Sequence, residues 1–197
     1  MGSIKSSLFI SLDGVIESPE TWHFDYFNDE MGAVIGELMG GSDATLLGRQ
    51  TYDEFAGYWP NADPEDPFTA VMNGARKYVV SNTLTRADWG DTTVLRGDVV
   101  GQVADIKQGG RGELQVHGSA RLAQALHAAG LIDEYRLLTF PVTVGAGKAL
   151  FTDDAPPRGY DLLESRTTRA GAVYQVLAPK AFEAGGLTVQ DGREAAR

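Results

Sequence analysis

The sequence contains no cysteine among its 197 residues. Disulfide bonds, cysteine nucleophiles and thiolate metal sites are therefore excluded. Only three histidines occur, and none forms a His-x-x-x-His pair, so we expect no metal site. Long apolar runs are also missing, and no stretch is long enough to cross a bilayer. We expect a cytoplasmic protein that does not associate with membranes.

Positive charge is scarce as well. The chain has 17 Lys and Arg residues against 27 Asp and Glu residues, which gives a formal net charge of −10 at pH 7. Because nucleic-acid binding requires a basic surface that displaces counterions, we expect no nucleic-acid partner. A small anionic ligand is not excluded, since it needs only a local site.

Apolar strands alternate with amphipathic helices over the first two thirds of the chain. The predicted strands cover residues 4–12, 44–47, 76–81, 92–95, 114–117 and a stretch ending at 140; the predicted helices cover about 29–39, 48–55, 98–106 and 119–130. Two further runs, 160–168 and 172–177, predict a closing hairpin. This pattern predicts an α/β fold whose central sheet is mixed and mainly parallel, flanked by helices, with a C-terminal antiparallel hairpin. We expect one domain over residues 1–180 and a flexible tail over 181–197, which is poor in apolar residues.

Two predicted strand-to-helix junctions have the features of phosphate-binding turns. One strand stops at His117-Gly118, and a helix follows for which Ser119 is a suitable N-cap; Gly48 stands in the same place after the strand 44–47. A helix that begins this way offers unpaired N–H groups to an anion, and glycine lets the anion approach closely. The alternative is that both are ordinary junctions of an α/β protein.

Two aspartates are candidates for chemistry. Asp13 follows the first strand, and because Asp-Gly is a turn signal, it either forms a turn or handles the substrate or a proton. Asp25 lies in the aromatic segment 22–27, just before the first predicted helix. The aromatic side chains there and at 58–59 either stack on a flat heterocycle or pack in the core.

A set of short motifs then shows a family resemblance. The motifs are Ser11-Leu12-Asp13-Gly14, Gly48-Arg49-Gln50-Thr51-Tyr52, Val79-Val80-Ser81, His117-Gly118-Ser119 and Gly130-Leu131-Ile132-Asp133-Glu134. In this order and spacing the chain resembles the dihydrofolate reductase superfamily, from about residue 4 to 179. It looks most like the branch related to the reductase domain of the bifunctional riboflavin-biosynthesis deaminase-reductase. One departure is His117, because the superfamily usually has two adjacent glycines where this chain has His117-Gly118.

The resemblance implies a dihydrofolate reductase-like fold that binds NADPH across the carboxyl ends of its strands. Carried onto this chain, the pyrophosphate would be held by Gly118, Ser119, Ala120 and Arg121; the adenosine-side phosphates by Gly48, Arg49 and Thr51; and the 2′-phosphate by Ser81 and Asn82. Asp13 matches the acid of the riboflavin-type branch, whereas Asp25 is nearer to the acid of the folate-reducing branch. For Arg49 the alternative is an ion pair with Asp53 or Glu54.

The implied function is an NADPH-dependent reductase that transfers a hydride to a small pterin-like or ribosylaminopyrimidine-like molecule. The alternative is an NADP-binding protein of the same fold without turnover. We also expect a homodimer, on the resemblance and on the apolar stretch 172–177.

Overall fold

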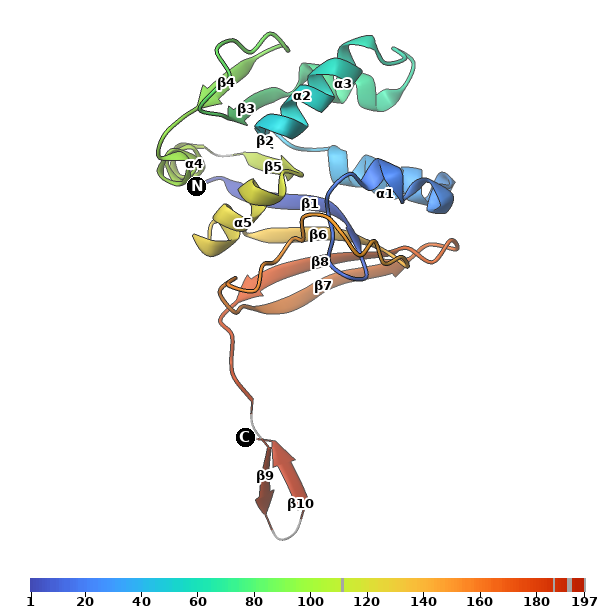
Figure 1. Ribbon diagram of the computed structural model, residues 1–197, viewed down its shortest axis with the longest axis vertical. Helices are drawn as coiled ribbons and strands as arrows, with labels where there is room; N and C mark the ends of the chain where they lie inside the picture. Colours follow the sequence, from blue (N-terminus) through green and yellow to red (C-terminus); the bar gives the residue numbers. More distant parts are fainter. Residues whose placement is uncertain (111, 186, 191–192, 197) are drawn as a thin grey trace.

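The computed structural model describes residues 1–110, 112–185, 187–190 and 193–196. Its centre is an eight-stranded sheet with the order β4-β3-β2-β5-β1-β6-β8-β7 (Figure 1). The strands are β1 (Ser3–Ser11), β2 (Ala44–Gly48), β3 (Arg76–Val80), β4 (Thr92–Leu95), β5 (Glu113–His117), β6 (Glu134–Phe140), β7 (Gly159–Thr167) and β8 (Val173–Lys180). Neighbouring strands from β4 to β6 are parallel, and β8 is antiparallel to both β6 and β7. The predicted mixed, mainly parallel sheet with a C-terminal antiparallel hairpin is confirmed.

Helices cover both faces of this sheet. They are α1 (Asp29–Met39), α2 (Arg49–Tyr58), α3 (Pro67–Gly74), α4 (Val99–Gly109) and α5 (Ala120–Ala128), with short 3-10 turns at Pro19–Thr21, Phe24–Tyr26 and Trp59–Asn61. The strand β2 shows the two layers, because Leu46 packs in the core under α4 and α5 whereas Leu47 packs with α2 and α3. Every residue of β2 is buried, which explains why its sequence is an unbroken apolar run rather than an alternating one.

The closing hairpin turns its apolar side chains inward. Ala172, Tyr174 and Val176 are buried against α1 and the end of β6. The apolar stretch 172–177, on which the expected homodimer partly rested, is therefore used inside the chain. The edge strand β7 instead exposes Leu162 and Leu163.

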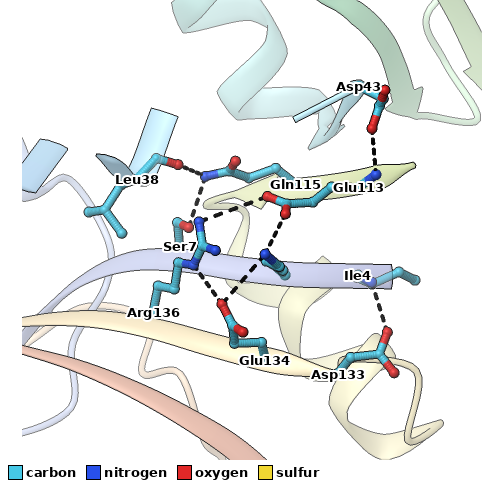
Figure 2. Close-up of polar contacts among 10 residues, drawn as sticks. Ile4, Ser7, Leu38, Asp43, Glu113, Gln115, Asp133, Glu134 and Arg136 are labelled. Atoms are coloured by element: carbon cyan, nitrogen blue, oxygen red, sulfur yellow. Dashed lines mark hydrogen bonds and ion pairs between the residues drawn. The ribbon is translucent and has the colours of Figure 1, made fainter. Parts of the chain in front are cut away.

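A polar network fixes the register of the central strands at their amino ends (Figure 2). Gln115 Nε2 donates to Ser7 Oγ at 2.9 Å and to the carbonyl of Leu38 at the end of α1. On the neighbouring strands, Lys5 pairs with both Glu113 and Glu134. Because these contacts join β5, β1, β6 and α1, they also set where the carboxyl ends of the same strands lie.

After the main sheet, β9 (Leu187–Gln190) and β10 (Arg193–Ala196) form a separate two-stranded antiparallel sheet, which lies apart from the main sheet in Figure 1. Some residues of the predicted tail lie outside the described residues, so the limit between domain and tail stays a prediction. Among the described residues, no helix combines the length and apolar character that a membrane span requires.

Candidate functional site

The two glycine-bearing junctions predicted from the sequence lie side by side. The strands β2 and β5 are parallel neighbours, with Leu46 opposite Val116, so Gly48 and Gly118 follow at the same edge of the sheet. Thr51 Oγ1 lies 2.8 Å from Ser119 Oγ, which joins the first turn of α2 to the start of α5. A Cβ at Gly48 would lie 2.2 Å from Ser119 Oγ, so only glycine fits there without displacing the neighbouring junction.

The start of α5 has the geometry of an anion site. Gly118 and Ser119 both adopt positive φ, at 72° and 66°, so the chain turns sharply into the first residues of α5. The Ser119 carbonyl accepts from Leu122 and Ala123. In the part of the chain that the structure describes, the N–H groups of Ala120 and Arg121 have no acceptor. These groups are free to bind an anion.

The N-cap position of Ser119 is confirmed, but its side chain does not cap the helix, because it makes no capping hydrogen bond at the start of α5. Its hydroxyl is engaged with Thr51 instead, and its positive φ differs from the extended backbone of an ordinary N-cap. Ala120 has only a methyl side chain, so its backbone N–H is its one possible donor to an anion, whereas the side chain of Arg121 is exposed.

Arg49 makes the ion pair that the sequence offered as the alternative. Its Nε donates to both carboxylate oxygens of Asp53, at 2.6 and 2.8 Å, one turn further along α2. The two side chains are 40% and 50% exposed. Such a pair is weak in water, so Arg49 exchanges readily between Asp53 and another anion.

Ser81 and Asn82 lie where the sequence predicted, directly after β3, and Val80 of that strand is opposite Gly48. Their side chains shape the local backbone. Ser81 Oγ accepts from the N–H of Leu84 at 2.9 Å, and Asn82 Oδ1 accepts from the N–H of Gly97 at 3.1 Å. Asn82 is exposed, but Ser81 is buried, so a hydroxyl contact to a ligand would require a change in this turn.

Asp13 holds a loop against the end of β1. One carboxylate oxygen accepts from Ser11 Oγ at 2.6 Å, and the other accepts from the N–H of Gly145 at 2.7 Å; Val144 N–H lies 3.1 Å from both oxygens. The bond from Ser11, with those from Gly145 and Val144, lowers the pKa of Asp13 to about 2. At neutral pH Asp13 is therefore an ionised acceptor.

Asp25 is separate from this loop contact. It lies exposed in the 3-10 turn Phe24–Tyr26, and its carboxylate makes no hydrogen bond with the described residues. The segment itself is anchored, because Tyr26 Oη donates to the carbonyl of Pro141 at 3.3 Å and His23 Nδ1 donates to the carbonyl of Pro19 at 2.7 Å. Asp13 and Asp25 therefore belong to differently anchored segments.

His117 was not among the site residues predicted from the sequence, but it lies directly beside the turn at Gly118. It ends β5 and directly precedes Gly118. Burial lowers the pKa of His117 to about 4, so its imidazole is neutral at physiological pH. The available signal was the departure from the superfamily pattern at this position.

An open cleft of about 590 Å³ lies beside α2, lined by Tyr52, Asp53, Asn73, Arg86 and Trp89 among others. It borders the site through Asp53, the partner of Arg49, but includes neither Gly118 nor Asp13. Among the described residues, no group of three or more His, Asp or Glu side chains has the arrangement of a metal site.

Comparison with known proteins agrees with this architecture. A family model described as the RibD C-terminal domain matches residues 3–174. The Bacillus subtilis (strain 168) protein YyaP, itself uncharacterized, is 29% identical over 174 residues, which cover 86% of this chain and 90% of YyaP.

Solved structures show the same fold at low identity. A Shewanella sp. PV-4 protein named for riboflavin biosynthesis has a TM-score of 0.73 and 22% identity, with 90% of this chain and 99% of that chain covered. RibD from Acinetobacter baumannii has a TM-score of 0.65 and 17% identity, and the match covers 91% of this chain and 58% of that chain. Dihydrofolate reductase from Enterococcus faecalis, complexed with NADP(H) and RAB-propyl, has a TM-score of 0.60 and 14% identity over 90% of this chain and 96% of that chain.

Proposed function

The chain belongs to the RibD C-terminal domain family, and we propose that it is an NADPH-dependent reductase of a small pterin-like or ribosylaminopyrimidine-like substrate. The observation that carries this proposal is the contact between the two junctions, where Gly48 and Thr51 of one meet Ser119 of the other. A dinucleotide has two linked phosphates and an adenosine end, so it requires adjacent anion sites rather than one. The dihydrofolate reductase neighbour with NADP(H) supports the choice of cofactor.

The residues at this edge fit such a cofactor. Gly118 leaves its position free of a side chain, and the unpaired N–H groups of Ala120 and Arg121 suit the pyrophosphate. Arg49, with Asn82 on the adjacent connection, suits a 2′-phosphate, because a guanidinium binds phosphate in a fixed geometry. On a chain with net charge −10, these local donors must attract the anion against a repulsive background.

When bound, NADPH supplies a hydride to the carbon of a C=N or C=O group. The heteroatom of that group then requires a proton. Asp13 is ionised and its oxygens accept hydrogen bonds from Ser11, Val144 and Gly145, so it holds the loop in place and does not donate the proton. In the proposed reaction solvent water supplies the proton, because Leu12 and Asp13 directly after β1 are exposed.

The test is NADPH oxidation, followed by absorbance, with 7,8-dihydropterin and with 5-amino-6-(5-phosphoribosylamino)uracil, alongside calorimetric titration of NADPH. Saturable oxidation with either substrate is the expected result. Tight NADPH binding with no oxidation would favour the alternative, a binding protein without turnover. Failure to bind NADPH would refute both functions.

A pair of glycine variants separates the site from the fold. Gly118 and Gly41 have similar φ values, 72° and 82°, and Gly41 lies before the amino end of β2, away from the junctions. Valine at either position strains the backbone. Gly118→Val should abolish NADPH binding, whereas Gly41→Val should only lower the melting temperature.

The assembly and location of the protein are further proposals. We propose a homodimer, for which the edge strand β7 with exposed Leu162 and Leu163 offers an apolar surface. Light scattering that gives the monomer mass at micromolar concentration would reject it. A cytoplasmic location stays a prediction.

A further inference from the structure

We propose that His117 is a specificity-determining residue, whose imidazole hydrogen-bonds the polar edge of a flat, uncharged heterocycle in the substrate site. The inference rests on the proposed reductase function, because it takes the turn at Gly118 as the cofactor end of that site. It adds the residue that recognises the substrate and the chemistry of the group recognised.

The side of the sheet on which His117 lies follows from its strand. Gln115, two residues earlier on β5, points toward α1, since its Nε2 bonds the Leu38 carbonyl and Ser7 Oγ (Figure 2). Side chains two residues apart on a strand share a face. His117 is therefore on the α1 side, opposite Ser7 in the register with β1. It ends β5 beside the cofactor turn, whereas Leu114 and Val116 pack under α4 and α5.

His117 also has unused hydrogen-bonding groups. In the described part of the chain its ring makes no hydrogen bond, and its nitrogens are not among the fully enclosed side-chain atoms that lack a partner. The rings of the other two histidines already have hydrogen-bond partners. His23 donates to the Pro19 carbonyl, and His127 bonds both Tyr135 Oη at 2.8 Å and the Pro156 carbonyl at 3.2 Å.

The charge state of the ring limits the ligand. Burial lowers the pKa of His117 to about 4, so at physiological pH it offers one N–H donor and one nitrogen acceptor, without a positive charge. A neutral imidazole does not attract a phosphate, but it complements a lactam or amino-imine edge, where a donor and an acceptor are adjacent. Pterins and aminopyrimidines have such edges, and any phosphate of the substrate would have to lie elsewhere.

The experiment compares two substitutions at this position. His117→Phe keeps an aromatic ring but removes both hydrogen-bonding atoms, whereas His117→Asn keeps a donor and an acceptor. With NADPH saturating, His117→Phe should raise KM for 7,8-dihydropterin by about five- to ten-fold, as expected for one neutral hydrogen bond. His117→Asn should stay within about three-fold of the wild type, and NADPH affinity should change less than two-fold in both variants.

His127→Phe is the matched control, because it removes a buried histidine away from the site. It should lower the melting temperature and leave KM unchanged. Binding of 7,8-dihydropterin to the NADP⁺ complex, measured by fluorescence in all variants, tests the inference even if no reduction occurs and the proposed function fails. Equal pterin affinity of His117→Phe and the wild type would overturn the inference. So would a parallel loss of NADPH affinity, which would make His117 a support of the turn.

Discussion

We predict that cofactor preference depends on which anion Arg49 binds. In the chain alone its Nε lies 2.6 and 2.8 Å from the carboxylate oxygens of Asp53, on a helix face where both side chains are about half exposed. NADPH and NADH differ by the 2′-phosphate, so a residue that binds this phosphate discriminates between them. We therefore predict opposite effects for Arg49→Ala and Asp53→Asn.

The magnitudes follow from exchanging one partner for another. A charged hydrogen bond to the 2′-phosphate contributes about 1.5 to 3 kcal/mol. Releasing Arg49 from Asp53 costs about 0.3 to 0.5 kcal/mol, the usual value for an exposed pair one helical turn apart. Arg49→Ala should thus weaken NADPH binding by roughly 1 to 2.5 kcal/mol, while Asp53→Asn should strengthen it by roughly 0.3 to 0.5 kcal/mol. Both effects should shrink at high salt, because the site is exposed.

The assay is calorimetric titration of NADPH and NADH into the wild type and both variants at low and high salt. Arg169→Ala is the matched control, since this exposed arginine pairs with Glu30 beside the β7–β8 turn. It removes the same charge without touching the junctions. Equal weakening of both nucleotides by Arg49→Ala, or of neither, would refute the reasoning, as would weaker NADPH binding by Asp53→Asn.

Three other changes test the site and the core. Gly48→Ala should destabilise the chain by about 1 to 3 kcal/mol in urea unfolding and weaken NADPH binding, because the added Cβ would clash with the Ser119 side chain. Adding Ser119→Gly should recover most of the stability, and a double variant as unstable as Gly48→Ala would contradict this explanation. Asp13→Asn should lower kcat about ten-fold with NADPH affinity nearly unchanged, because the amide lacks the negative charge and one of the two acceptor oxygens that hold the Val144–Gly145 loop; equal loss of cofactor binding would mark Asp13 as a structural turn residue. Burial lowers the pKa of Lys77, with Asp91 partly offsetting it, so the contribution of Lys77 to stability rises as pH approaches the ordinary lysine pKa. Burial raises the pKa of Tyr135, Tyr160 and Tyr174, and these groups act in the opposite direction. Lys77→Met should therefore make the pH dependence of stability at alkaline pH less favourable than in the wild type, and an unchanged pH slope would contradict the prediction.

The sheet was predictable because local pattern and tertiary position agree. The stretch 44–47 is apolar throughout since helices cover both faces of β2, and the two extended runs on either side of Gly171 form the hairpin of β7 and β8. The family resemblance added the expectation that both junctions lie at the carboxyl ends of the strands. The side-chain contact between the junctions was not predictable, because the sequence does not give the distance between side chains 68 positions apart, such as Thr51 and Ser119.

The sequence also did not decide which partner Arg49 has. For Arg49 the sequence offered the helix neighbour or the cofactor, and the ligand-free chain has the neighbour. The observed pair does not conflict with the proposed contact to the cofactor, since an exposed pair of this kind is weak enough to be replaced by a stronger anion. The sequence does not decide between the two partners, because both are compatible with the fold.

Ser119 and Asp13 show how tertiary contacts override a correct local signal. Serine is favoured at an N-cap because its oxygen accepts from the first turn, yet Ser119 gives its hydroxyl to Thr51 and leaves the N–H groups of Ala120 and Arg121 open. A capped helix would have one donor fewer for a phosphate. Likewise Asp13 forms the turn that Asp-Gly predicts, and in doing so ties the end of β1 to Gly145. The structural and functional interpretations of these residues are therefore compatible, because a side chain that fixes the backbone of a site also decides which donors of that site remain free.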